Sequence, residues 1–354
     1  MRQPPPRSVR RFVVAPIVFV GALVFALLSP FILLLAAVVD LVVDRRRWRL
    51  VRVIGLGLAF CVVEAFGLFA AFTTWIGSGF GRNYDRPFWA HAHTVLVGQW
   101  LELITRALRF HLGFTFELSH DPLPQGRQLV FSRHAGPGDA LLLARIVVRD
   151  QGRRLHMVGA NKLQWDPFLD ILGERLGFHY LAAKPEDARE DLDRIRSLAA
   201  SLEHDETLVI FPEGGNFTPS RRELSIQALE RRGRFAYALR AVAMRYTLAP
   251  KPGAVTAAME GAPDATVVFV AHAGLDGIYG FADLWRAIPL RRRSTAQAWV
   301  APLDERPTGY TEQTYWLYRQ WTAVDEWIAA TYVEISVQED LDVDSGDSVG
   351  TMAG

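Results

Sequence analysis

The sequence predicts an α/β protein in which a mixed sheet is flanked by helices and preceded by a membrane-embedded helical hairpin region. Three observations support this fold class. Half of the 354 residues are hydrophobic, long apolar stretches are concentrated in the first 76 residues, and short strand-like runs alternate with helical patterns from about residue 88 to 335.

Charge and cysteine content indicate the partners and the cellular compartment of the protein. The formal net charge is only +1, yet residues 1–55 contain nine arginines and two aspartates, and residues 1–11 form a basic segment. Such clusters are attracted to anionic lipid, so we expect an anionic membrane surface as a partner and no nucleic acid. The single cysteine, Cys61, excludes an intrachain disulfide and predicts no metal site, which fits a reducing, cytoplasm-facing location.

Residues 12–76 are predicted to anchor the protein in the cell membrane. Residues 12–43 would form a straight helix about 48 Å long, whereas the hydrocarbon core is about 30 Å thick. Proline disrupts a helix, so we expect Ser29-Pro30 to divide this stretch into two short re-entrant helices, with both basic clusters on one leaflet. The alternative is two ordinary spans with an imperfect positive-inside pattern. Glu64 is expected to face a helix partner or the interface rather than act in the lipid.

The remaining chain divides into three parts. Residues 77–126 are predicted to form a linker and an interfacial helix, residues 127–335 an α/β domain, and residues 336–354 a disordered acidic tail. An amphipathic helix is expected at 185–205 and an aromatic, core-packed helix at 310–332. The expected strands are 127–132, 154–160, 207–213, 242–248, 265–273 and 295–303.

His134 and Asp139 are the first candidate site residues. His134 follows the predicted strand 127–132, and Asp139 begins the next helical pattern. A carboxylate that accepts the proton of one ring nitrogen leaves the other nitrogen able to take up a hydroxyl proton. Since no recognised nucleophile motif is present, the substrate would have to supply the hydroxyl group. The alternative is a turn histidine beside a helix cap.

A second candidate site lies in residues 211–222, after another buried-looking strand. Glu213 and Gly214 are followed by the pair Arg221 and Arg222. Glycines let backbone amides approach an anion, and the guanidinium fork matches phosphate oxygens. The alternative is a strand end with a surface arginine pair.

Taken together, these residues resemble the glycerolipid acyltransferase family typified by 1-acylglycerol-3-phosphate (lysophosphatidic acid) acyltransferase. The shared blocks follow in order from about residue 127 to 330, and the long third block with Thr218 and the segment 312–328 look closest to the lysocardiolipin acyltransferase-like branch. The blocks are His134 with Asp139, residues 159–178, Phe211–Gly214, and residues 246–255.

The resemblance implies transfer of a fatty acyl group from acyl-CoA or acyl carrier protein to the free hydroxyl of a lysophospholipid. His134 would be the general base and Asp139 its orienting partner, with no cofactor beyond the donor. Residues 127–335 would form the acyltransferase catalytic domain. A homodimer is left open. The implied substrate-binding residues are Glu213, Gly214, Arg221, Asn161, Lys162, Lys184, Thr218 and Pro250.

Two departures from the family pattern concern the acceptor. Gly215 replaces the usual threonine or serine, with the arginine displaced to Arg221, and Lys184 stands where the second block usually ends in arginine. Lysophosphatidic acid, giving phosphatidic acid, is the first expected acceptor. The alternatives are another lysophospholipid such as lysocardiolipin or lysophosphatidylglycerol, a CoA-independent transacylase as in the tafazzin group, and a non-catalytic lipid-binding membrane protein.

Overall fold

The computed structural model describes residues 4–43, 45–120, 123–136, 138–181, 188–278, 280–290 and 293–349. Its centre is a seven-stranded sheet in the order β1-β7-β6-β2-β5-β3-β4. The strand β7 is antiparallel to β6 and parallel to β1, and the other strands run parallel to β6, which confirms the mixed sheet. The strands are β1 (Thr115–His120), β2 (Gln128–Ser132), β3 (Arg154–Ala160), β4 (His179–Leu181), β5 (Glu206–Ile210), β6 (Thr266–Ala273) and β7 (Arg293–Ala301).

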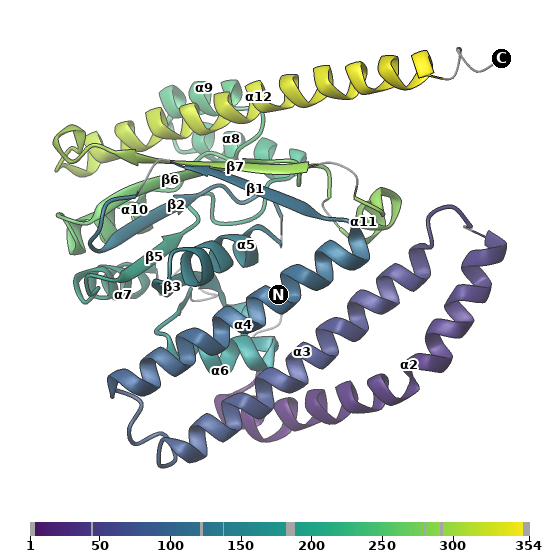
Figure 1. Ribbon diagram of the computed structural model, residues 1–354. Helices are drawn as coiled ribbons and strands as arrows, with labels where there is room; N and C mark the ends of the chain where they lie inside the picture. Colours follow the sequence, from purple (N-terminus) through teal and green to yellow (C-terminus); the bar gives the residue numbers. More distant parts are fainter. Residues whose placement is uncertain are drawn as a thin grey trace.

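Helices cover both faces of the sheet (Figure 1). Residues of α7, α10 and α12 pack against one face, and residues of α3, α4, α5 and α6 pack against the other. The helices are α1 (Arg7–Val9), η1 (Arg10–Val14), α2 (Ala15–Val43), α3 (Arg49–Gly77), α4 (Pro87–Leu112), α5 (Asp139–Arg145), η2 (Ile146–Asp150), η3 (Asn161–Trp165), α6 (Pro167–Arg175), α7 (Ala188–Ala200), α8 (Pro219–Arg231), α9 (Phe235–Ala243), α10 (Pro252–Gly261), α11 (Phe281–Ala287), η5 (Leu303–Glu305) and α12 (Tyr310–Val349).

The alternation of side chains along β2 explains why both faces of the sheet are covered. Leu129 and Phe131 join one hydrophobic cluster, and Val130 joins the other. Successive side chains of a strand point to opposite faces, so a strand that is buried throughout needs helices on both sides. The aromatic face of α12 supplies one cover with Trp316 and Trp321, both buried, which confirms the expected core packing.

The strand expected at 242–248 is wrong. Helix α9 continues to Ala243, and residues 245–247 form a bend. The carboxylate of Asp325 accepts hydrogen bonds from the backbone N–H groups of Arg245 and Tyr246, at 2.9 and 2.7 Å. These amides are satisfied by a side chain, so the segment needs no neighbouring strand.

The sheet begins earlier than the sequence predicted. The strand β1 lies inside the expected linker 77–126 and pairs with β7, so the boundary of the α/β domain at residue 127 is corrected to Thr115. Helix α4 precedes this strand and packs beneath the sheet through Trp100 and Leu101, both 2 % exposed.

Helix α2 does not reverse direction at Ser29-Pro30, so the expected re-entrant division there is wrong. The helix continues through Pro30 and bends, and the chain reverses between α2 and α3, which pack side by side (Figure 1). Proline leaves the carbonyl of Ala26 without its usual amide donor, and the hydroxyl of Ser29 donates to that carbonyl at 2.7 Å. The local serine therefore compensates for the proline inside the helix.

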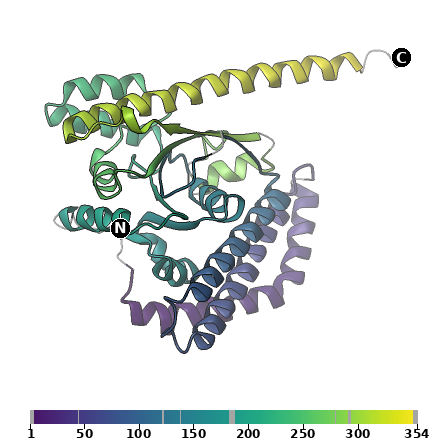
Figure 2. The ribbon, with the colours of Figure 1, turned by 60° about the vertical axis from the view of Figure 1, so that its left-hand side comes forward.

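Both ends of α2 contact the α/β domain. At the start of the helical segment, Arg10 forms an ion pair with Asp170 of α6 at 3.0 Å. After its end, the guanidinium of Arg47 donates to the carbonyl of Arg286 in α11 at 3.2 Å. By length and composition alone, Arg7–Val43 and Arg49–Gly77 are long and apolar enough to cross a membrane. In this structure, however, α2 and α3 lie alongside the α/β domain (Figure 2).

Glu64 joins α3 to the α/β domain, as expected for a residue that faces a helix partner. It is 1 % exposed, and its Oε1 accepts the backbone N–H of Phe168 at 3.0 Å. One turn further along α3, a Cβ at Gly67 would lie 2.7 Å from the ring of Phe168. Glycine therefore permits the close approach of α3 to α6.

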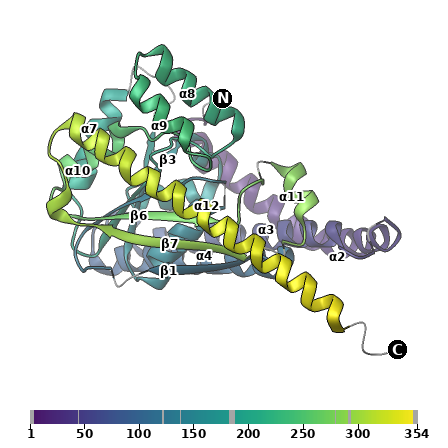
Figure 3. The ribbon, with the colours of Figure 1, turned by 90° about the horizontal axis from the view of Figure 1, so that it is seen from above.

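The predicted disorder of residues 336–354 is corrected for residues 336–349. Helix α12 runs without interruption from Tyr310 to Val349 and extends beyond the sheet (Figure 3). No proline occurs in this stretch and the first glycine is Gly346, so the packed first half can propagate as helix into the acidic half. Residues 350–354 lie outside the described residues.

Candidate active site

The candidate site lies at the carboxyl edge of the parallel strands. His134 follows β2, Glu213 follows β5, His272 lies near the end of β6, and Asn161 follows β3. These strands are neighbours in the sheet, so their ends bring residues far apart in sequence to one edge. Crevices at this edge are the usual ligand sites of open α/β sheets.

The structure brings His134 and Asp139 together. The ring Nδ1 of His134 lies 2.9 Å from Oδ1 and 3.1 Å from Oδ2 of Asp139. An ionised carboxylate can only accept, so Nδ1 carries the proton and Nε2 is the acceptor nitrogen. Within the described part of the chain, Nε2 has no hydrogen-bond partner, and the side chain is 18 % exposed. The ring therefore presents one basic nitrogen toward a ligand.

Asp139 is held as a carboxylate by its surroundings. Burial raises its pKa, but hydrogen bonds from His134 and His272 more than offset this effect and lower the pKa below its usual range. The backbone N–H groups of Gly136 and Ala140 also donate to it, at 3.0 and 2.7 Å. These two turn amides orient Asp139, which leaves them unavailable to stabilise an oxyanion.

His272 is a site residue that the sequence analysis missed. Its Nε2 lies 3.4 Å from Oδ2 of Asp139 and 3.2 Å from the carbonyl oxygen of Arg133. A histidine near the end of an apolar strand carries little signal by itself. The pairing of β6 with β2 places it beside the turn that holds His134.

Glu213 is a buried residue that connects two segments of the site. It is 2 % exposed, its Oε1 accepts the N–H of His134 at 3.2 Å, and its Oε2 accepts the N–H of Leu248 at 3.1 Å. Both oxygens are thus used to join the His134 turn to the segment before α10. Through these two hydrogen bonds Glu213 positions the His134 turn.

The titration of Glu213 gives a prediction about stability. Burial raises its pKa from 4.5 to about 8, although the charge of Arg133 opposes this change. The folded state therefore keeps a proton that the unfolded chain releases, so the contribution of this group is fully present below pH 4.5 and is lost as pH rises to about 8. Between pH 5 and 8, the unfolding free energy of wild type should fall by on the order of a few kcal/mol relative to Glu213→Gln. The measurement is chemical denaturation of both proteins across this pH range. Parallel curves of unfolding free energy against pH would contradict the assignment.

Arg133 and Asp276 form a buried ion pair beneath the His134 turn. Arg133 is fully buried, and its Nη1 lies 3.0 Å from Oδ2 of Asp276. The guanidinium also donates to the carbonyls of His272 at 2.7 Å and Tyr246 at 2.7 Å, and Tyr332 of α12 donates to Asp276. This network ties β2, β6 and α12 to the site, and the sequence analysis assigned no role to it.

A cavity of about 690 Å³ adjoins Glu213 and Gly214. Four cationic residues line it: Arg221, Arg232, Arg234 and Lys251. None of the four forms an ion pair within the described ranges. Burial lowers the pKa of Lys251, and the charges of Arg221 and Arg232 lower it further. We refer to these four residues as the basic pocket.

Gly214 brings Lys251 into the basic pocket. Its φ of +68° is a left-handed conformation that favours glycine, and a Cβ there would lie 2.6 Å from Nζ of Lys251. On the other side, Nη1 of Arg221 donates to the carbonyl of Asn216 at 3.0 Å. The glycine loop is thus held between two cations, an arrangement suited to a phosphate group.

The other predicted residues lie in different parts of the chain. Pro250 lines the basic pocket, and Asn161 and Lys162 lie in η3 after β3. Thr218 caps α8 by accepting the N–H of Arg221 at 3.2 Å, so the structure gives it a local role. Lys184 lies outside the described residues.

Arg222 turns away from the basic pocket. Its Nε donates to the carbonyl of Met244 at 2.6 Å, and its Nη2 donates to that of Val242 at 2.7 Å. The arginine pair of the sequence therefore separates into one residue at the pocket and one at the end of α9.

In the described part of the chain, no three His, Cys, Asp or Glu side chains gather as a metal site would require.

Comparison with known protein families gives a match to part of the chain. Residues 115–273 match the family model described as Acyltransferase, a range that includes the His134–Asp139 pair, Glu213, the basic pocket and His272. Neither the comparison with curated proteins nor the comparison with solved structures found a match. The family match supports acyltransferase activity in general, and its start at residue 115 agrees with the start of β1.

Proposed function

We propose that the protein transfers a fatty acyl group from acyl-CoA or acyl carrier protein to the free hydroxyl of a lysophospholipid, with lysophosphatidic acid as the first candidate acceptor. The observation that carries this proposal is the His134–Asp139 pair with its open Nε2. Ser132, the hydroxyl residue closest in sequence, is 2 % exposed and donates to the carbonyl of Arg133 at 3.1 Å. It is therefore a poor candidate for a nucleophile, which favours a hydroxyl brought by the substrate.

The proposed reaction proceeds by direct transfer. Nε2 of His134 takes the proton of the acceptor hydroxyl as its oxygen attacks the thioester carbonyl, and Asp139 stabilises the imidazolium that forms. The carbon–sulfur bond then breaks, and the imidazolium returns the proton to the departing thiolate. The products are a diacyl phospholipid and the free thiol of the donor.

The basic pocket supports a phosphate-bearing acceptor. Its cations lie next to the Gly214 loop, and Glu213 connects this loop to His134 through one hydrogen bond. A head-group phosphate bound between Arg221 and Lys251 would therefore remain close to the base. Lysine contributes a point charge and arginine a fork, and both are common phosphate ligands.

We also propose that α2 and α3 lie within one leaflet and place the site at the cytoplasmic face of the cell membrane. Both ends of α2 contact the α/β domain, whereas a full crossing would put them on opposite sides of the bilayer. The outer faces of α2 and α3 remain apolar, with Phe31 of α2 at 73 % and Phe69 of α3 at 57 % exposed. A lysophospholipid could then reach the site from the membrane without a transit through water.

The experiment is a substrate panel with purified protein in detergent micelles. Labelled acyl-CoA and acyl carrier protein thioester are each offered with lysophosphatidic acid, lysophosphatidylglycerol, lysocardiolipin and lysophosphatidylcholine. We expect transfer to an anionic lysophospholipid and little to the zwitterionic one. Transfer to none of them by folded protein, or transfer without a thioester donor, would refute the proposal.

A second candidate acceptor carries two phosphate groups, as lysocardiolipin does. The specific observation is the number of cations, because one phosphate monoester needs fewer than four. Within the basic pocket, Arg221 and Lys251 contact the glycine loop, while Arg232 and Arg234 lie at the turn between α8 and α9. We refer to Arg232 and Arg234 as the distal pair. They are available for a second phosphate of the acceptor or for the phosphates of CoA.

Replacement of the distal pair tests this candidate. The double variant Arg232→Gln and Arg234→Gln should raise KM about tenfold for the substrate whose phosphates it binds and leave kcat nearly unchanged. A rise for lysocardiolipin but not lysophosphatidic acid would identify the acceptor, and a rise for acyl-CoA would identify the donor. The matched control is Arg231→Gln, an exposed arginine of α8 outside the pocket. Equal KM values for variant and wild type on every substrate would exclude a role for the pair.

A further inference from the structure

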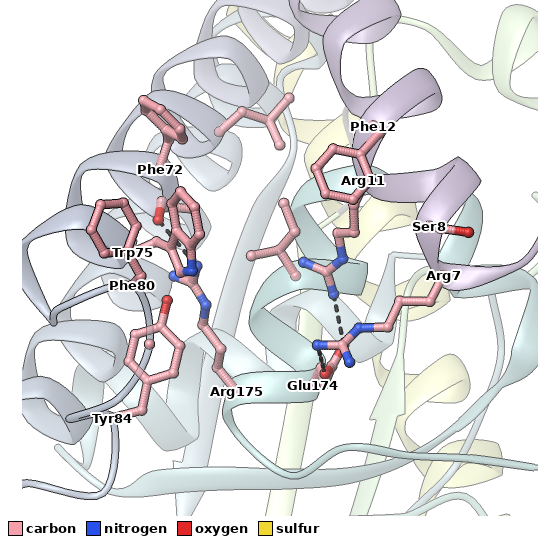
Figure 4. Close-up of a pocket in the computed structure, with 14 residues that line it drawn as sticks. Arg7, Ser8, Arg11, Phe12, Phe72, Trp75, Phe80, Tyr84, Glu174 and Arg175 are labelled. Atoms are coloured by element: carbon pink, nitrogen blue, oxygen red, sulfur yellow. Dashed lines mark hydrogen bonds and ion pairs between the residues drawn. The ribbon is translucent and has the colours of Figure 1, made fainter.

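A separate cavity of about 740 Å³ lies away from the candidate active site. The start of the helical segment at Arg7, the end of α3, the following link and the end of α6 enclose it (Figure 4). It shares no lining residue with the basic pocket. Helix α6 begins near the carboxyl edge of β3 and carries Arg175 in its last turn, so about 13 Å of helix separates the two regions.

Arg175 places a guanidinium in this cavity that forms no hydrogen bond or ion pair with a carboxylate of the described residues. Its Nη1 lies 3.1 Å from Oγ1 of Thr74 and 3.2 Å from Nε2 of His93, and its Nη2 lies 3.1 Å from the carbonyl oxygen of Ala71. Burial lowers the pKa of His93 to about 4, with a contribution from Arg175, so this imidazole is neutral. Every observed partner of the guanidinium is thus uncharged. A partly buried cation in this situation favours an anionic ligand.

The other arginines of the cavity do not offset this charge. Arg7 and Arg11 pair with Glu174, and Arg11 lies 3.3 Å from Asp170, which also pairs with Arg10. Three arginines therefore share two carboxylates. Together with Arg175, the rim and floor of the cavity carry an excess of positive charge.

Tyr84 supplies an unused hydrogen-bond donor beside Arg175. The guanidinium carbon of Arg175 lies 4.7 Å from the centre of the Tyr84 ring, and Figure 4 shows the hydroxyl directed toward the guanidinium. This hydroxyl oxygen is buried and has no partner among the described residues. Buried polar groups are normally satisfied, so an unpaired donor next to a guanidinium that pairs with no carboxylate of these residues is a second indication of an anion.

The walls of the cavity are aromatic, so they favour an apolar part of a ligand. Phe72, Trp75 and Phe80 stand together on one side of the cavity, and Phe12 stands across from them (Figure 4). Phe12 of η1 and Phe80 of the link after α3 are 81 % and 62 % exposed, so the rim of the cavity is apolar where it meets solvent. A soluble inorganic anion would leave these rings in contact with water, whereas an acyl chain would cover them.

We infer that this cavity binds the head group of an anionic membrane lipid, with the phosphate on Arg175 and Tyr84 and the first part of an acyl chain across Phe72 and Phe80. The guanidinium fork and the hydroxyl match phosphate oxygens, and the aromatic walls match hydrocarbon. This binding does not depend on acyl transfer. It would add a head-group-specific contact to the apolar attachment of α2 and α3.

The test uses the full chain in non-ionic detergent and a short-chain phosphatidic acid, dihexanoyl phosphatidic acid, kept below its micelle concentration. Titration by calorimetry uses protein that carries Arg221→Gln and Lys251→Gln, so that the basic pocket does not contribute, and should give saturable binding of one lipid at this site. Tyr84→Phe should weaken it about tenfold, because only the donor hydroxyl is lost. Arg175→Lys should weaken it at least as much, because the charge remains but the fork is lost. The control is Arg82→Gln, an exposed arginine in the same link that does not line the cavity.

Several results would overturn the inference. Equal affinity in proteins with and without Tyr84→Phe, both folded, would remove the hydroxyl from the site. Equal losses in Arg82→Gln and Arg175→Lys would indicate general surface electrostatics. Competition by inorganic phosphate at the affinity of the lipid would indicate a simple anion site. Binding of dihexanoyl phosphatidylcholine as tightly as the phosphatidic acid would remove the charge requirement.

Discussion

Replacement of His134 with alanine is expected to lower kcat/KM for acyl transfer by about 10³- to 10⁴-fold while leaving the fold and lipid binding intact. The ring is 18 % exposed, and its Nδ1 is engaged by Asp139, so its removal eliminates the base without opening the core. The backbone N–H group at position 134, which donates a hydrogen bond to Glu213, is retained in the variant. Initial rates over a range of acceptor concentrations provide the measurement.

The matched control for this prediction is His204→Ala. His204 is exposed and precedes β5, at the amino edge of the sheet, so its loss removes an imidazole far from the site. We expect this variant to retain wild-type kinetics. A value of kcat/KM for His134→Ala within about tenfold of wild type would exclude His134 as the general base.

The second large effect concerns stability. Asp276→Asn should lower the unfolding free energy by about 3–5 kcal/mol, because it leaves Arg133 charged and unpaired in the interior. Arg133 is fully buried, and Asp276 is the acidic partner that the structure shows for its guanidinium. Denaturant unfolding followed by tryptophan fluorescence provides the measurement.

Asp304→Asn is the control for this second variant. Asp304 is exposed in η5. Its substitution removes the same charge from the protein surface, where single substitutions change stability little. If Asp276→Asn were destabilised by less than about 1 kcal/mol, the buried pair would not support the site as described. A large loss in both variants would point to net charge rather than to this network.

Local patterns explain what could be predicted from the sequence. The strands β2, β3, β5, β6 and β7 were located because each combines apolar residues with a turn signal at its end. His134 and Asp139 were paired correctly in space because both belong to one strand–turn–helix unit, in which the distance along the chain fixes the distance in the fold. The two arginine clusters were expected on one side, and both contact the α/β domain.

The unpredicted features depend on contacts between distant segments. His272 reaches Asp139 only through the pairing of β6 with β2, and the partner of Arg133 comes from the loop after β6. The segment around Tyr246 resembles a strand in its residues, but Asp325 of α12 satisfies its amides instead. The resemblance implied substrate binding for Glu213, and the two backbone amides that donate to its oxygens could not be foreseen from the sequence. Such partners have no signature within a short window of sequence.

The central claim is that the acyl group passes directly from the donor to a hydroxyl of the lipid, with His134 as the base. The most direct measurement is a single-turnover reaction of labelled acyl-CoA with excess enzyme and lysophosphatidic acid or lysocardiolipin, quenched in denaturant and separated into protein and lipid. We predict label in the diacyl product and none on the protein, with product formation abolished in His134→Ala. Label attached to the protein, or label that never reaches any lipid acceptor, would contradict the proposed mechanism.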